Sequence, residues 1–155
     1  MKFENIIVGT DLSPASQPAV THACQLAHQF QARLHIVHVA MVPFLDYIEQ
    51  VQEDFGQTME ACEEQHVAQA RQTLLELDTT PLSADQIVPV VLRGLPVDQI
   101  QAYARSHAAD LLILGTHGYT GVKHALMGST AERLVRESTC PVLTIRQPTE
   151  STTAA

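Results

Sequence analysis

The chain has 155 residues, of which 45% are hydrophobic and 17% carry a charged side chain. This length suits one domain with a single core, and this composition excludes wholesale disorder. Seventeen acidic residues against nine basic ones give a formal net charge of −8. A nucleic-acid binder normally carries the opposite sign, because neutralising phosphates supplies most of its affinity. We therefore expect one globular domain that does not bind nucleic acid.

The cysteines and the N-terminal segment indicate the cellular compartment of the protein. Cys24, Cys62 and Cys140 lie far apart in the chain, which excludes a C-x-x-C metal or redox pair and a disulfide framework. The apolar stretch at residues 6–8 is too short for a signal-peptide core or a membrane span. We expect a cytoplasmic protein without a membrane span.

The first half of the chain alternates strand and helix patterns. Residues 6–9 predict a buried strand, and Ser13 followed by Pro14 predicts the N-cap and first position of a helix. Residues 34–39 predict the second strand. A second helix follows and ends near residues 78–81. Its inward face is marked by residues 59, 62, 67, 70, 74 and 77. The intervening residues, 41–57, match neither pattern.

The second half continues the alternation. Residues 87–92, 110–116 and 142–145 predict three more strands. One helix begins at Gly94-Leu-Pro96, with Val97, Ile100 and Ala104 inward, and another covers residues 131–137. The polar tail, 147–155, is expected to be disordered, which leaves residues 1–146 as the domain. This alternation predicts an α/β fold, with a mostly parallel five-stranded sheet and helices on both faces.

A glycine-rich loop separates the fourth strand from the last helix. Its spacing, G-x2-G-x9-G-S, is set by Gly115, Gly118, Gly128 and Ser129. Such a loop presents backbone N–H groups and a helix N-terminus to an anion, and glycine lets the backbone approach a phosphate closely. The spacing differs from the P-loop and from the dinucleotide G-x-G-x-x-G motif. The loop therefore predicts an anion site that neither general motif describes.

Several short segments, in one order along the chain, resemble the universal stress protein family. They cover about residues 4–146 and comprise VGTDLS at 8–13, VHV at 37–39, GLP at 94–96, DLLILGTHG at 110–118, GSTAERLV at 128–135, STCPVL at 138–143 and Arg146. The resemblance implies an open, Rossmann-like sheet of strand order 3-2-1-4-5. It also implies a homodimer, formed through the fifth strand, whose open edge invites pairing. The complete G-x2-G-x9-G-S loop resembles that of the ATP-binding subset of the family.

The resemblance also assigns binding roles within the glycine-rich loop. Gly115 and Gly118 match positions where the backbone lies against ribose and phosphates. Gly128, Ser129 and Thr130 match the helix N-terminus that holds the phosphates, and two of these residues offer hydroxyl donors. Threonine at position 130 replaces the aliphatic residue frequent in the family. Residues 119–124 also lie in the variable part of the family's loop, which leaves open the preference among ATP, ADP, AMP and cyclic nucleotides.

Other site residues lie outside or in the middle of that loop. Thr10 and Asp11 match the first loop of the family, where the acid, when ionised, could accept from a ribose hydroxyl or help to hold Mg²⁺. Val39 matches the residue whose backbone meets adenine. His117 and Lys123 bring potential positive charge toward the phosphates. There is an alternative for two of these residues: Asp11 could serve solely as a cap for the following helix, and Lys123 could be a solvated loop residue.

Two further features favour ordinary interpretations. The eight histidines lack ligand spacing; His35 and His38, for example, lie three apart on a strand and so point to opposite faces. We therefore predict no metal site built from protein side chains. Residues 41–64 are rich in Asp and Glu and favour a solvated face, with a partner surface or a flap over the nucleotide as alternatives.

No catalytic set is indicated by order and spacing, and neither a Walker lysine nor an arginine finger is evident. We interpret the chain as an ATP-binding regulator of the stress response that uses Mg²⁺, with a protein partner that the sequence does not identify. Two alternatives stay open. One is an enzyme that hydrolyses ATP slowly with a water oriented by Asp11 or His117. The other is a dimeric interaction module that does not use nucleotide.

Overall fold

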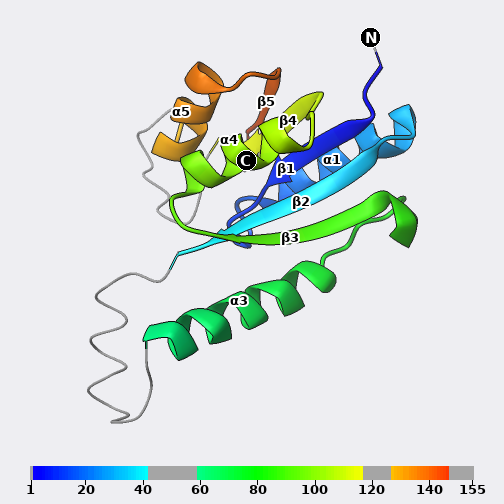
Figure 1. Cartoon of the computed structure of the whole chain (residues 1–155). Helices are drawn as coiled ribbons and strands as arrows, with labels where there is room; N and C mark the ends of the chain where they lie inside the picture. The colour runs from blue at the N-terminus through cyan, green and yellow to red at the C-terminus, as the bar shows by residue number, and fades with distance from the viewer. Residues whose placement is uncertain (1, 42–58, 117–126, 147–155) are drawn as a thin grey trace, which may run out of the picture.

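The computed structural model describes residues 2–41, 59–116 and 127–146. Within these ranges, five parallel strands form one sheet in the order β3-β2-β1-β4-β5 (Figure 1). The strands are β1 (Asn5–Gly9), β2 (Arg33–Ala40), β3 (Ile87–Arg93), β4 (Leu111–Gly115) and β5 (Val142–Ile145). The helices are α1 (Gln17–Phe30), α3 (Met59–Leu75), α4 (Pro96–Ser106) and α5 (Ser129–Glu137), with a short 3-10 turn at Ala84–Gln86. The expected α/β fold and its strand order are confirmed.

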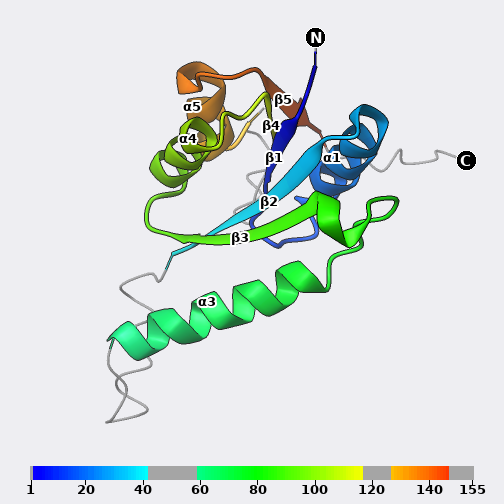
Figure 2. The ribbon, with the colours of Figure 1, turned by 45° about the vertical axis from the view of Figure 1, so that its right-hand side comes forward.

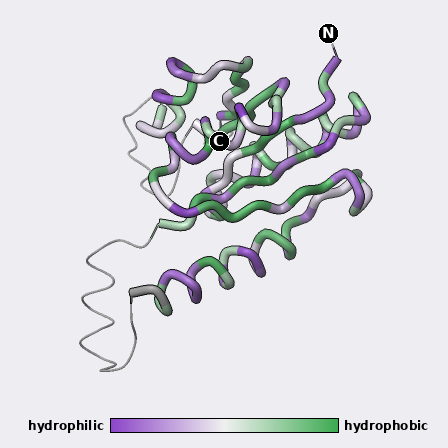
Figure 3. The backbone as a smooth tube through the Cα atoms, viewed as in Figure 1, coloured by the Kyte–Doolittle hydropathy of each residue, from purple (hydrophilic) through white to green (hydrophobic). Residues whose placement is uncertain are grey.

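Helices cover both faces of the sheet (Figure 2). Successive residues of a strand point to opposite faces, so Ile6 and Val8 pack with α1 and the end of α3, whereas Ile7 packs with α4 and α5. All three side chains are fully buried. The central strands are therefore apolar along most of their length, while α3 alternates polar and apolar residues (Figure 3). This arrangement makes two cores, one on each face.

The inward faces of the helices match their sequence patterns. Val97, Ile100 and Ala104 are the buried residues of α4, as expected. On α3 the buried positions include Cys62, Ala70 and Leu74. That helix ends at Leu75, a few residues before the predicted end.

The start of α1 was predicted wrongly. The helix begins at Gln17 with Ser16 at the N-cap, rather than at Pro14 with Ser13 as the cap. The reason is local competition for hydrogen bonds. The Ser13 hydroxyl donates to the Asp11 carboxylate (2.6 Å) instead of capping a helix, and the Ser16 N–H closes a turn onto the Ser13 carbonyl (3.1 Å). Side-chain bonds of this kind favour turns over helix.

The register of β1 determines where the connecting loops meet. Gly9, at the end of β1, pairs with Val37 of β2 and with Leu114 of β4. A Cβ atom on Gly9 would lie 2.8 Å from Cδ2 of Leu114, so glycine leaves room for the Leu114 side chain. The chain leaves β1 toward β2 and leaves β4 toward β5. Loops after β1 and β4 therefore flank the point where strand order reverses, where open α/β sheets bind ligands.

Several sequence predictions fall outside the described residues. They concern residues 42–58, which make up most of the unassigned stretch and part of the acidic segment, the tail at 147–155, and His117, Gly118 and Lys123 in the glycine-rich loop. In the part of the chain that is described, no helix has the length and apolar character needed to cross a membrane.

Candidate functional site

A cavity of about 330 Å³ opens at the carboxyl ends of β1, β2 and β4. Small-ligand sites typically measure roughly 300–1,000 Å³, and this one lies at the strand-order reversal, where such sites are expected. Its walls come from the β1–α1 loop, the end of β2, the start of α4, the end of β4 and the start of α5. The lining residues are Gly9, Thr10, Asp11, Ser16, His38, Val39, Met41, Pro96, Ile100, Leu114, Gly115, Thr116, Gly128, Ser129, Thr130 and Ala131.

The cavity collects most of the residues that the sequence nominated. Those that line it are Thr10, Asp11, Val39, Gly115, Gly128, Ser129 and Thr130. The others, His117, Gly118 and Lys123, lie outside the described residues. Residues more than one hundred positions apart in the chain thus share one cavity, because parallel strands end at the same edge of the sheet.

The β1–α1 loop forms one wall through a compact hydrogen-bond network. The Asp11 carboxylate accepts from both the backbone N–H (3.0 Å) and the hydroxyl (2.6 Å) of Ser13. The Thr10 hydroxyl oxygen accepts from the N–H of Leu12 (3.0 Å) and lies 2.8 Å from the Ser16 hydroxyl. Asp11 therefore stabilises its own loop while lining the cavity, and it does not cap α1.

The opposite wall is the N-terminus of α5. Gly128 is its N-cap; its N–H donates to the carbonyl of Thr116 (2.7 Å) and its carbonyl accepts from the N–H of Glu132 (2.9 Å). The first N–H groups of a helix have no acceptor within the helix, and the dipole makes this end partly positive. The cavity wall formed by Ser129 and Thr130 can therefore attract an anion.

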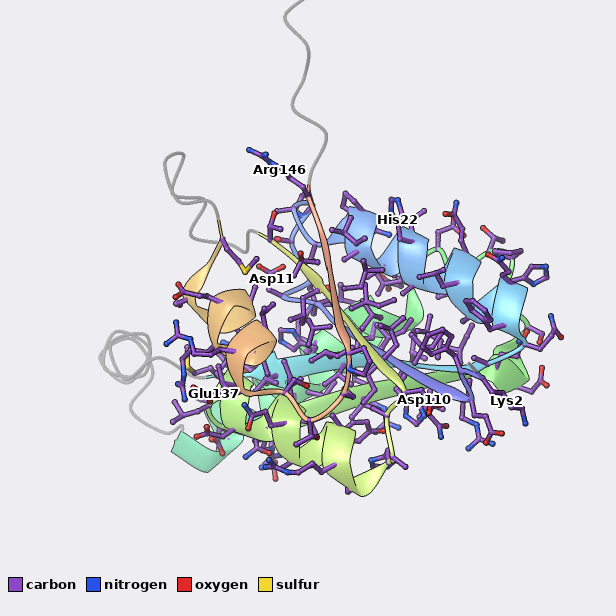
Figure 4. The ribbon with its side chains drawn as sticks, turned by 90° about the horizontal axis from the view of Figure 1, so that it is seen from above. Lys2, Asp11, His22, Asp110, Glu137 and Arg146 are labelled. Atoms are coloured by element: carbon purple, nitrogen blue, oxygen red, sulfur yellow. The ribbon has the colours of Figure 1, made fainter. Side chains whose placement is uncertain are left out.

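The two walls lie at one end of the sheet. In Figure 4, Asp11 and Arg146 occupy that end, whereas Asp110 and Lys2 lie at the other. Between the walls the cavity is apolar, with Val39, Ile100 and Leu114 among its lining residues. An apolar interior flanked by a carboxylate and a helix N-terminus suits a flat ring that carries a polar, anionic extension.

Sequence reasoning missed three polar lining residues, Ser16, His38 and Thr116. His38 was weighed only as a metal ligand, together with His35. The structure separates them: Nδ1 of His35 contacts the hydroxyl of Tyr103 on α4, whereas Nδ1 of His38 contacts the carbonyl of Thr10 (3.0 Å). The sequence did contain a signal that His38 lines the site: it lies just before Val39, at the end of a buried strand. No group of three potential metal ligands occurs among the described residues.

Comparison with known proteins shows the family to which this chain belongs. The model of the universal stress protein family matches residues 2–146. The chain belongs to the universal stress protein family. A universal stress protein of Thermus aquaticus is 30% identical over 146 residues, which cover 93% of this chain and 99% of that protein.

Solved structures of universal stress proteins share the fold. UspA from Lactobacillus plantarum is 30% identical, with a TM-score of 0.71, and the match covers 94% of this chain and 99% of that one. A universal stress protein solved in complex with cAMP is 24% identical, with a TM-score of 0.69 and coverage of 94% and 98%. The expected family is thereby confirmed, and the cAMP complex is an instance of a nucleotide bound to this fold.

Proposed function

We propose that this universal stress protein is a cytoplasmic, ATP-binding regulator of the stress response, whose conformation or choice of partner depends on bound nucleotide. The observation that carries the proposal is the cavity between Asp11 and the N-terminus of α5. A helix N-terminus favours phosphate, and a carboxylate favours hydroxyl donors such as those of ribose. The resemblance of the sequence to the ATP-binding subset of the family supports the same ligand.

Each part of the nucleotide has a matching wall. Gly128, Ser129 and Thr130 would hold the phosphates through backbone N–H groups and hydroxyls, and adenine would lie beside Val39. Asp11 would accept from the ribose or contribute one oxygen ligand to Mg²⁺, which prefers oxygen ligands and brings phosphates as partners. The bound Mg²⁺ would supply charge neutralisation for the phosphates. These roles assign every described residue that the sequence nominated, apart from Thr10, which holds the loop, and Gly115.

The ionisable residues of the cavity favour binding over catalysis. Of the described residues that line it, Asp11 and His38 are ionisable. Enzymes that transfer phosphoryl groups usually place lysine, arginine or several metal ligands around the phosphates. No such set is present in the described wall, so we propose regulation by nucleotide binding rather than turnover.

The first test identifies the ligand. The purified protein is denatured and any released nucleotide is identified by mass, after which the empty protein is titrated with Mg-ATP by calorimetry. Bound ATP, or saturable binding of added ATP, supports the proposal. If no nucleotide is released and no heat appears at millimolar ATP, the interaction module becomes the better account.

A variant at Gly128 locates the binding site. A Cβ atom there would lie 3.6 Å from the Thr116 carbonyl oxygen, an ordinary contact, so Gly128→Ala should fold normally. The added methyl would nevertheless separate the cavity wall from the phosphates. We expect binding to weaken about tenfold or more, equivalent to about 1.4 kcal/mol. Unchanged affinity would exclude this helix end as the phosphate site.

A pair of variants distinguishes a nucleotide-binding regulator from an ATP-hydrolysing enzyme. Asp11→Asn removes the carboxylate charge from the cavity, and Asp98→Asn, in the exposed first turn of α4, is the matched control. The regulator predicts that Asp11→Asn alters affinity, with no ATP turnover in either protein. ATP turnover by the purified protein that falls in Asp11→Asn, but not in Asp98→Asn, would instead establish the enzyme.

We also propose that two copies pair through β5. In the described part of the sheet, β5 pairs with β4 alone, so its other edge has unpaired backbone groups. Leu143 on this edge strand is an exposed apolar side chain, and so is Val135 on α5. An open edge with apolar neighbours favours association with an identical edge.

A further inference from the structure

Thr10, the first residue after β1, is held to β2 at both of its backbone polar groups. Its N–H donates to the carbonyl of Val37 (2.9 Å), and its carbonyl oxygen lies 3.0 Å from Nδ1 of His38. A carbonyl oxygen can only accept, so Nδ1 of His38 must carry the hydrogen. The first contact continues the ladder of the sheet. The second is an additional bond, made by a side chain that also lines the cavity.

The Thr10 side chain connects this anchored backbone to the rest of the loop through hydrogen bonds. The Ser16 hydroxyl donates to the Ser13 carbonyl (3.0 Å), so its single hydrogen is used and the Thr10 hydroxyl donates to Ser16. The Thr10 oxygen in turn accepts from the N–H of Leu12. Thr10 and Ser16 are both buried. The directions of these bonds are therefore determined, and they tie both ends of the loop together.

The loop needs these hydrogen bonds because one of its residues has an energetically unfavourable backbone conformation. Leu12 has a φ of 64°, a left-handed conformation that costs a non-glycine residue free energy and persists only where surrounding contacts impose it. Asp11 lies between Leu12 and Thr10, and its carboxylate bonds to Ser13. A change at Thr10 would therefore move the carboxylate that faces the cavity.

We propose that His38 is a positioning residue of the nucleotide site, which holds the Thr10 carbonyl and thereby places the Asp11 carboxylate at the cavity wall. The proposal rests on the proposed function for the identity of the ligand, but the hold on the loop exists without ligand. His38 acts through Thr10 and Asp11. Both the neutral ring with hydrogen on Nδ1 and the protonated ring can donate this bond, so protonation does not release the loop.

Substitutions can separate the two ring nitrogens. The amide nitrogen of asparagine can take the place of Nδ1, whereas that of glutamine reaches the place of Nε2. We therefore expect His38→Asn to keep the hold on Thr10, and His38→Ala and His38→Gln to lose it. His66→Ala is the matched control: its Nδ1 also contacts a backbone carbonyl, that of Cys62 (2.8 Å), but on α3 and outside the cavity lining.

The first experiment measures the loop in the ligand-free protein. Amide hydrogen exchange of Leu12 and Ser13 should accelerate about tenfold in His38→Ala and His38→Gln, the loss expected for one hydrogen bond. The same amides should exchange at the wild-type rate in His38→Asn and His66→Ala. Nitrogen chemical shifts of the wild-type ring should show hydrogen on Nδ1. Wild-type exchange in His38→Ala, or hydrogen on Nε2 alone, would overturn the proposal.

The second experiment measures coupling to the ligand. His38→Ala should weaken Mg-ATP binding about tenfold, with recovery in His38→Asn, and should have less than about a twofold effect once Asp11 is asparagine. Additive effects of the two substitutions would show that His38 does not act through Asp11. If the wild-type protein binds no ATP while the exchange pattern appears, the proposed function fails and the positioning of the loop stands.

Discussion

Nδ1 of the buried His35 on β2 lies 2.9 Å from the hydroxyl oxygen of Tyr103 on α4. The ring of His107 stacks on Tyr103, with centroids 3.9 Å apart, and lies 5.4 Å from the ring of His35. His35 is 4% exposed, and its Nε2 makes no hydrogen bond to any described residue. Burial, with smaller contributions from His107 and Arg33, lowers the pKa of His35 to about 4.

This lowered pKa predicts that the protein loses stability in weak acid. The unfolded chain, in which the pKa of His35 is near 6.5, binds a proton at His35 more readily than the folded protein. Stability from this residue is therefore complete above about pH 6.5 and is lost as the pH falls toward 4. Between pH 7.5 and 5.0 we expect its contribution to fall by about 2 kcal/mol, measured by urea unfolding at constant ionic strength.

A variant isolates the contribution of His35 from that of other titrating groups. His35→Phe keeps a ring in the core and removes the ionisable nitrogens. The difference in unfolding free energy between the two pH values should shrink by about 2 kcal/mol in this variant. An unchanged pH dependence would show that His35 does not become charged when the protein unfolds.

Gly94 predicts a second stability effect, at the connection between β3 and α4. Its φ of 121° suits glycine alone, and a Cβ atom there would lie 3.2 Å from Nε2 of Gln99. Gly94→Ala should lower the unfolding free energy by about 1–3 kcal/mol, because alanine rarely adopts this backbone conformation. Urea unfolding provides the measurement. Gly128→Ala, where φ is −70°, is the comparison: it lacks this backbone strain and should cost less than Gly94→Ala, through the weaker N-cap preference of alanine alone.

The three cysteines should differ in reactivity. Cys24 and Cys62 are 0% and 1% exposed, whereas Cys140 is half-buried, with its Sγ 3.5 Å from the Ser138 hydroxyl. Burial, with a contribution from Asp78, raises the pKa of Cys24 to about 11, which removes the reactive thiolate at neutral pH. Titration with a disulfide reagent at pH 8 should modify Cys140 in the native protein and all three thiols in denaturant. Rapid native reaction in Cys140→Ser would contradict this order.

Pairing through β5 predicts the effect of a surface charge. Leu143→Arg places a cation on the open edge, where a second copy would have to bury it. Sedimentation should show the wild-type protein at twice its chain mass of 17.0 kDa at micromolar concentration, and this variant as a monomer. Leu75→Arg, on an exposed apolar residue of α3, is the matched control and should leave the dimer intact. A wild-type monomer would refute pairing.

The sequence predicted elements wherever one local pattern dominated. The buried run of β4 and the inward residues Val97, Ile100 and Ala104 of α4 follow from hydrophobic periodicity, because burial of one face outweighs weaker preferences. The start of α1 did not follow. There the Asp11 carboxylate binds Ser13, and Leu12 takes a left-handed conformation. The segment therefore forms a turn, although Ser13 followed by Pro14 is a strong local signal for a helix N-cap.

By itself the sequence determined the βα alternation, the family resemblance and the nominated residues Thr10, Asp11, Val39 and Gly128, because these depend on spacing along the chain. Tertiary structure alone decided that these residues share a cavity with His38, and that its ring nitrogen holds the Thr10 carbonyl. That contact depends on the register of β1 against β2, in which Gly9 lies beside Val37. Register arises from the packing of both faces of the whole sheet, which no single segment encodes.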